Sequence, residues 1–195
     1  MPARDRRERE YAERHRLIIA TARRLAEADG WAAVTTRRLA DTIEYSQPVL
    51  YSHFREGKDA IVGAVALQGF EELTAALREA REATDRPGTA LHRAAHAYIE
   101  FAVANPALYD AMFVLPTTLR FAHPDTPPAL DAAYRELALA VEQVAGDADA
   151  ETLTEVVWSA LHGLVGLQRS GRLRPGHDTA RLDLLLDRLA SSGDG

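Results

Sequence analysis

Residues 35–58 read TTRRLADTIEYSQPVLYSHFREGK, and this stretch decides the fold of the N-terminal region. Its apolar residues recur at helical spacing in two short runs. Thr35 or Thr36 can cap the first run and Ser46 the second, because hydroxyl side chains favour the position just before a helix. The side chains expected to face inward are Leu39, Ala40, Ile43, Val49, Leu50 and Phe54. The stretch therefore predicts two short helices joined by a tight turn.

A longer helix is predicted before this pair, from about residue 13 to Gly30, where the glycine can end it. Three helices in this order form a helix-turn-helix unit, in which the second helix braces the third against the major groove of DNA. Polar residues at the start of the third helix then meet base edges, while flanking hydroxyls, aromatics and cations meet phosphates. The expected function of this region is DNA binding.

The charge distribution agrees with a DNA-binding head on an acidic body. The 195 residues carry a formal net charge of −6. Residues 1–60 hold 12 basic and 10 acidic groups, whereas residues 61–195 hold 11 and 19. The first part is thus mildly basic, although chance segregation of charge would give the same split. Four arginines near the start, interspersed with acidic residues, predict a flexible tail that touches phosphate or the minor groove: Arg4, Arg6, Arg7 and Arg9.

Composition also excludes several classes of protein. The chain has no cysteine, which removes disulfides, thiolate zinc sites, iron–sulfur clusters and thiol nucleophiles. No apolar run approaches the roughly 20 residues of a membrane helix, and the charged start lacks the apolar core of a secretory signal. We therefore expect a soluble cytoplasmic protein without a membrane partner.

The rest of the chain predicts more helices, so the expected fold class is all-α. A long helix begins near Lys58 and breaks at residues 85–88, and several others follow. The prolines of residues 117–128 predict a loop. The expected domains are a helix-turn-helix head over residues 1–58, including the flexible tail, and a body of five to six helices over residues 59–195.

The head resembles that of the TetR family of transcriptional repressors. The residues that carry this resemblance are Thr35-Thr36-Arg37-Arg38-Leu39-Ala40, then Ser46-Gln47-Pro48-Val49-Leu50-Tyr51-Ser52-His53-Phe54, and Lys58. The spacing of Trp158, His162 and Gly163 is also similar to the WHG-type C-terminal domain that accompanies some of these heads. The resemblance implies a DNA-binding set of Thr36, Arg37, Tyr45, Ser46, Gln47, Pro48, Tyr51, His53 and Lys58. Gln47 would read bases, and Thr36, Tyr51, His53 and Lys58 would contact phosphates.

The sequence departs from the family pattern at two points. Glu44-Tyr45 stands where a Gly-Val pair usually precedes the serine cap, which predicts a different turn. Three residues separate Phe54 from Lys58 where the family commonly has two, which affects the reach of the lysine to a phosphate.

The body is expected to dimerise, because two heads on a two-fold axis read half-sites about one helical turn apart, roughly 34–36 Å. Wide apolar stripes in the last two helices predict a bundle between subunits, with an intramolecular core as the alternative. The predicted interface residues are Val157, Leu161, Leu164, Leu182, Leu185, Leu186 and Leu189.

A small-molecule pocket is predicted from aromatic and soft side chains in the body, although a core needs the same residues. The candidates are Tyr98, Phe101, Tyr109, Met112, Phe113, Trp158 and His162. The overall hypothesis is a homodimeric repressor that binds a double-stranded DNA operator and is released by a small, largely apolar or aromatic effector.

Two other classes of function compete with this hypothesis. His92 and His96, four residues apart, could hold a metal in an enzyme, but no H-E-x-x-H pattern, glycine-rich phosphate loop or nucleophile elbow is present. We therefore expect no catalysis, no cofactor and no metal. A helical protein-interaction module with a degenerate head is the second alternative, which the polar Gln47, Tyr51 and His53 disfavour.

Overall fold

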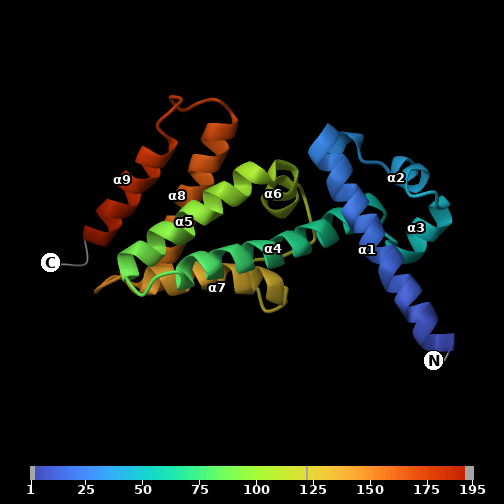
Figure 1. The fold of residues 1–195 in the computed structure, drawn as a ribbon, viewed down its shortest axis with the longest axis horizontal. Coiled ribbons are helices and arrows are strands. Elements are labelled where there is room, and N and C mark those ends of the chain that lie inside the picture. The colour runs from blue at the N-terminus through green and yellow to red at the C-terminus, as the bar shows by residue number, and fades with distance from the viewer. Residues whose placement is uncertain (1–2, 122, 192–195) are drawn as a thin grey trace. The chain divides into compact units, whose positions relative to one another are not determined.

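The computed structural model describes residues 3–121 and 123–191, and the described chain is helical without strands (Figure 1). This confirms the predicted all-α fold class. The helices are α1 (Ala3–Asp29), the short 3-10 turn η1 (Trp31–Ala33), α2 (Thr36–Thr42), α3 (Gln47–His53), α4 (Lys58–Glu82), α5 (Pro87–Ala104), α6 (Pro106–Phe113), α7 (Pro128–Glu142), α8 (Ala150–Arg169) and α9 (Asp178–Ser191).

The helices divide into two compact units. The first, the head unit, runs up to Gly69 and includes Asn105–Arg120; the second, the body unit, comprises Phe70–Ala104 and the described residues from Phe121 onward. The long helix α4 belongs to both. By length and hydropathy alone α4 could cross a membrane, but half of that stretch is buried inside the fold, as in a core helix.

The head unit includes α6 because α6 is tied to α1 and η1. The carboxylate of Glu27 accepts from the backbone N–H groups of Ala107 and Leu108, at 3.1 and 2.9 Å, and so caps the start of α6. The indole N–H of Trp31 donates to the carbonyl of Ala107 at 2.7 Å. The domain boundary predicted at residue 58 gives no sign that α6 packs with the head, since these contacts join residues about 80 positions apart.

Helix α1 begins at Ala3, about ten residues earlier than predicted. The segment expected to be a flexible basic tail is therefore helical, which corrects that prediction. The acidic residues among the arginines explain the helix, because they stand four positions away from them: Arg4 pairs with Glu8 at 2.9 Å and Arg6 with Glu10 at 3.5 Å.

In the body unit, α5 packs against α7, α8 and α9, and α7 packs against α8. The buried side chains along these helices include Leu91, Leu130, Leu137, Leu161 and Leu186. An ion-pair cluster joins the second half of α4 to α7: Arg78 and Arg81 both donate to Glu136, which is 5% exposed.

Candidate nucleic-acid interface and effector pocket

The turn between α2 and α3 has a residue in the left-handed backbone conformation typical of glycine, although that residue is not a glycine. Thr35 caps α2, its hydroxyl accepting from the N–H of Arg38 at 3.1 Å. Glu44 adopts a φ of 58°, the left-handed conformation that glycine reaches at least cost. The N–H of Tyr45 then bonds to the carbonyl of Ala40 at 3.0 Å. The turn at Glu44-Tyr45 therefore contains a left-handed residue that is not glycine.

Helix α3 has one buried side and one open side. Leu50 and the adjoining Phe54 are 1% and 4% exposed, so they anchor the helix to the rest of the unit. Gln47, Pro48 and Tyr51 are exposed. Ser46 occupies the N-cap position but makes no side-chain capping bond. The first turn of α3 therefore presents unpaired polar groups to solvent, as base and phosphate contacts require.

The structure brings Thr36, Tyr51 and Gly57 together. A β-carbon built on Gly57 would lie 3.3 Å from Cε1 of Tyr51 and 3.7 Å from Cγ2 of Thr36. Gly57 has a φ of 62°, and its N–H bonds to the carbonyl of Phe54 at 3.0 Å. The extra residue between Phe54 and Lys58 is thus accommodated in a left-handed turn. Two predicted phosphate contacts, Thr36 and Tyr51, consequently lie side by side.

Lys58 is half-buried, and its ammonium group donates to the carbonyl of Trp31. This bond ties the start of α4 to η1. An ammonium group has three protons to donate, so two remain for a phosphate. Arg37, by contrast, is exposed on α2 and lies 3.9 Å from the carboxylate of Asp41.

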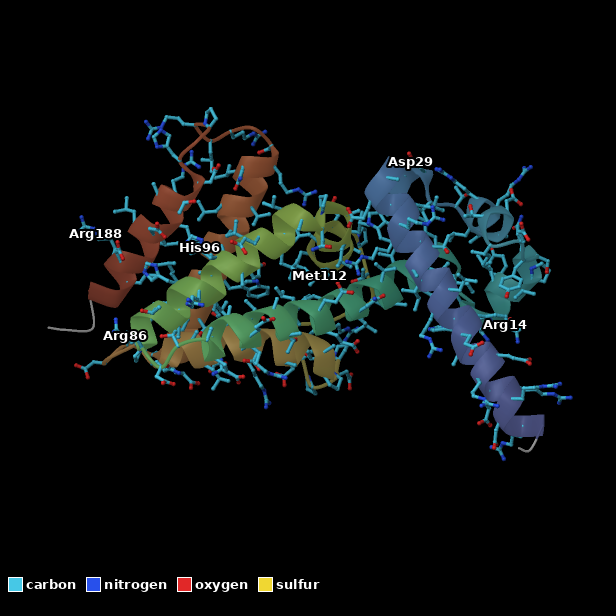
Figure 2. The ribbon with its side chains drawn as sticks, viewed as in Figure 1. Arg14, Asp29, Arg86, His96, Met112 and Arg188 are labelled. Carbon is cyan, nitrogen blue, oxygen red and sulfur yellow. The ribbon has the colours of Figure 1, made fainter. Side chains whose placement is uncertain are left out.

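His53 lies in a stack of rings between α1 and α3. Its ring centroid is 4.0 Å from that of Tyr11, and His15 stacks on Phe54 at 4.5 Å. Nδ1 of His53 is buried, with no hydrogen-bond partner among the described residues. Burial lowers the pKa of His53, and the neighbouring His15 and Arg14 lower it further; Arg14 lies on α1 (Figure 2). A phosphate contact by His53 would therefore use its other nitrogen, Nε2, since Nδ1 is buried.

Sequence reasoning missed Tyr11, which also reaches the carbonyl of Ser52 with its hydroxyl at 3.4 Å. The residue lies 41 positions before Ser52, and a single sequence contains no signal for such a pairing.

The structure changes the set of residues that a second subunit can touch. Four of the predicted interface side chains are covered by the chain itself, at 0 to 2% exposure: Val157, Leu161, Leu182 and Leu186. They belong to the intramolecular core, which corrects their assignment. The other three are half-buried: Leu164, Leu185 and Leu189. The large exposed apolar side chains of these two helices are instead Val156, Leu167 and Leu184.

The predicted pocket residues fall into both units. Tyr98, Trp158 and His162 form a network in the body unit, where Tyr98 Oη lies 2.8 Å from Nδ1 of His162 and accepts from the indole N–H of Trp158 at 3.3 Å. Burial lowers the pKa of His162. Phe101 is half-buried in the same unit. The remaining three lie on α6 in the head unit, where Tyr109 and Phe113 have ring centroids 4.8 Å apart: Tyr109, Met112 (Figure 2) and Phe113.

His92 and His96 of α5 face two carboxylates of α9. His96 Nε2 lies 2.8 Å from Asp183, and His92 Nε2 lies 3.3 Å from Asp187. Across the part of the chain that the structure describes, no group of three or more His, Asp or Glu side chains is arranged to hold a metal ion. These contacts instead link α5 to α9.

Two family models match the sequence. Residues 18–65 match the model described as bacterial regulatory proteins of the tetR family, and residues 91–191 match a tetracyclin repressor-like C-terminal domain. The chain belongs to the TetR family of transcriptional regulators. The family predicted from the residues of α2 and α3 is therefore confirmed. Members of this family are generally not enzymes.

One curated protein and several solved structures are similar to this chain. An uncharacterized helix-turn-helix transcriptional regulator of Bacillus subtilis, YobS, is 31% identical over 97 residues, and the alignment spans 49% of each chain. A solved Rhodococcus protein of unknown function has a TM-score of 0.74 at 26% identity, covering 91% of this chain and 94% of its own. The TetR-family regulator PfmR of Thermus thermophilus has a TM-score of 0.63 at 20% identity, covering 89% and 97%.

Proposed function

We propose that the chain acts in the cytoplasm as a homodimeric repressor that binds a two-fold symmetric operator and is released by a small effector. The observation that carries the DNA-binding role is the exposed side of α3. Gln47 and Tyr51 are exposed there, above the buried Leu50 and Phe54. Gln47 would read bases, because its amide both donates and accepts, whereas Tyr51 and Thr36 would contact one phosphate together.

The proposed dimer uses the outer face of α8, which we call the α8 stripe: Val156, Ala160, Gly163 and Leu167. These residues recur every three to four positions and so share one side of the helix. Val156 and Leu167 are 51% and 42% exposed. Leu184 of α9, at 59%, adds to the apolar surface that a second copy would cover in an intersubunit bundle.

The effector would bind the body unit and act on the head through α4, which begins directly after the turn that follows α3 and ends in the body unit. If the effector binds more tightly to a body conformation that holds the two heads at the wrong spacing, operator affinity falls by the ratio of its two affinities. Aromatic side chains around Trp158 support an apolar or aromatic ligand.

Selection of bound sequences from a random duplex pool tests this function. The purified full chain should enrich a two-fold symmetric motif at near-physiological salt, where phosphate attraction alone no longer dominates. A folded dimer that enriches no sequence would contradict the proposal and favour the protein-interaction module with a degenerate head.

Two variants separate the roles within α3. Gln47→Ala should change which bases are enriched at one position of each half-site, because it removes a base contact worth about 1–3 kcal/mol. Tyr51→Phe should weaken binding to all sequences by a similar factor and leave the preferred motif unchanged. Equal effects of the two variants on sequence preference would exclude this division.

A further inference from the structure

A pocket in the body unit has a lining that bears on the charge of the effector. The pocket has a volume of about 370 Å³ and is lined by residues of α7 and α8 together with Phe121, His123, Pro124 and Thr126. Leu130, which is 2% exposed, is one of its lining residues. Three aromatic side chains line it, and three carboxylates stand among its lining residues: Asp131, Glu151 and Glu155. It therefore combines an apolar interior with an acidic rim.

The aromatic lining is centred on Trp158. The ring centroid of Trp158 lies 5.9 Å from that of Phe121 and 6.1 Å from that of Tyr134, and the Tyr134 ring is inclined at 74°. The indole N–H is already used, since it donates to Tyr98 Oη. The indole of Trp158 therefore offers a ligand its face and edges. The face of an aromatic ring is electronegative and attracts cations.

The negative charge of the rim is only partly compensated. Asp131 is neutralised by Arg135 at 2.9 Å, but neither Glu151 nor Glu155 forms an ion pair or hydrogen bond within the described chain. The two glutamates are four residues apart on α8, so they project from one side of the helix. No lysine or arginine is among the residues that line the pocket.

The neighbouring Tyr134 is consistent with this negative potential. Burial raises the pKa of Tyr134, and Glu155, Glu151 and Asp149 raise it further. The pocket therefore favours a positively charged ligand over a neutral or anionic one.

We propose that this pocket binds an organic cation with an aromatic or compact alkyl ammonium group. The charged end lies at the rim between Glu151 and Glu155, and the apolar end lies against Trp158 and Tyr134. A divalent metal ion does not suit the site, because no three carboxylate or histidine side chains of the described residues are grouped closely enough to hold one. The inference rests on the proposed function, in which the body unit binds the effector, and it adds a positive charge to the expected apolar or aromatic ligand.

The test compares two ligands of the same shape on the full-length chain. Benzyltrimethylammonium carries the charge, and 2,2-dimethylpropylbenzene is its neutral isostere. Titrations followed by tryptophan fluorescence, with Trp158 in the wall of the pocket, and by calorimetry give the two dissociation constants. The cation should bind at least tenfold more tightly. The double variant Glu151→Gln/Glu155→Gln should lose this preference, and Glu142→Gln, an exposed α7 position outside the pocket, should retain it.

Equal binding of the two ligands, no binding of the cation, or an undiminished preference in the double variant would each overturn the inference. The random-duplex selection is read separately, because it depends on α3 and not on these glutamates. If the chain selects an operator but does not bind the cation, only the pocket assignment is refuted. If the chain binds the cation but selects no DNA sequence, only the repressor function is refuted. Both glutamates are exposed, so the isosteric substitutions should leave the fold intact.

Discussion

At the scale of single residues, Glu44 occupies a backbone conformation that its side chain disfavours. Its φ of 58° places the β-carbon close to a backbone oxygen, which costs L-residues about 1–2 kcal/mol. Glu44→Gly should remove this strain. Because glycine also loses more backbone entropy on folding, we expect a net gain of about 0.5–1 kcal/mol in the free energy of unfolding, measured in urea at fixed protein concentration.

The matched control is Glu44→Ala. Alanine removes the carboxylate but keeps the β-carbon, so it should show no comparable gain. If alanine stabilises the chain as much as glycine does, the charge of Glu44 and not its backbone conformation is the source of the cost.

His162 should make the stability depend on pH. Burial lowers its pKa in the folded chain, while the unfolded side chain titrates near 6.5. The folded state then binds fewer protons, so the free energy of unfolding should fall as pH drops below about 6.5 and level off below the folded pKa. His162→Asn, which keeps an acceptor for Tyr98, should flatten this decline. Unfolding in urea from pH 8 to pH 5 measures it; His177→Asn, at an exposed position, is the control.

His53 contributes to the same decline, because its pKa is lowered in the same direction. The slope in His162→Asn should therefore be reduced but not abolished. An unchanged slope would show that the interior around Tyr98 accepts the protonated imidazole without cost.

At this scale, the sequence predicted the local role of a side chain better than it predicted which distant residue that side chain contacts. Thr35 was a candidate cap because hydroxyls favour that position, and it caps α2. The stack of Tyr11 on His53 was not predictable, because the pairing depends on where α1 crosses α3 and not on local spacing. The backbone conformation of Glu44 was not predictable from its residue type either, since glutamate disfavours positive φ and the surrounding turn holds it there.

At the scale of helices, the contact between α4 and α7 depends on one buried carboxylate. Glu136 accepts from Arg78 at 2.7 Å and from Arg81 at 3.1 and 2.9 Å. Glu136→Gln would leave Arg81, whose side chain is 17% exposed, without its main counter-charge. Because loss of one partner of a buried ion pair typically costs 3–5 kcal/mol, and Arg78 is half exposed, we expect a loss of about 3 kcal/mol in urea unfolding.

Glu142→Gln on the same helix provides the comparison. Its side chain is exposed, so the substitution should change stability by less than about 0.5 kcal/mol. Similar small effects of both variants would mean that the cluster around Glu136 contributes orientation without net stability.

Helical periodicity predicted most of the elements but not all of their ends. It missed the first turns of α1 because those turns have no apolar face and are stabilised by pairs such as Arg4–Glu8. It also could not orient α8, which is apolar on several sides. Val157 and Leu161 are covered by the chain, whereas Val156 and Leu167 are open, and only the packing of α8 against α5 and α7 decides which is which.

At the scale of the whole molecule, the α8 stripe should decide the oligomeric state. Val156→Glu/Leu167→Glu would place charges on the face that a second copy is proposed to cover, and burying unpaired carboxylates is costly. Both positions are exposed in the single chain, so the variant should fold. Sedimentation should show a monomer at micromolar concentration, and binding to a two-half-site operator should fall by at least a hundredfold while a single half-site is bound as before.

Leu139→Glu on α7 is the control, because Leu139 is a 41% exposed leucine outside the stripe and should leave the dimer intact. A double variant that still sediments as a dimer would place the interface elsewhere. A monomer that keeps tight operator binding would contradict the view that specificity comes from two heads held at a fixed spacing. The two measurements are therefore needed together, since each tests a different step from the α8 stripe to the operator.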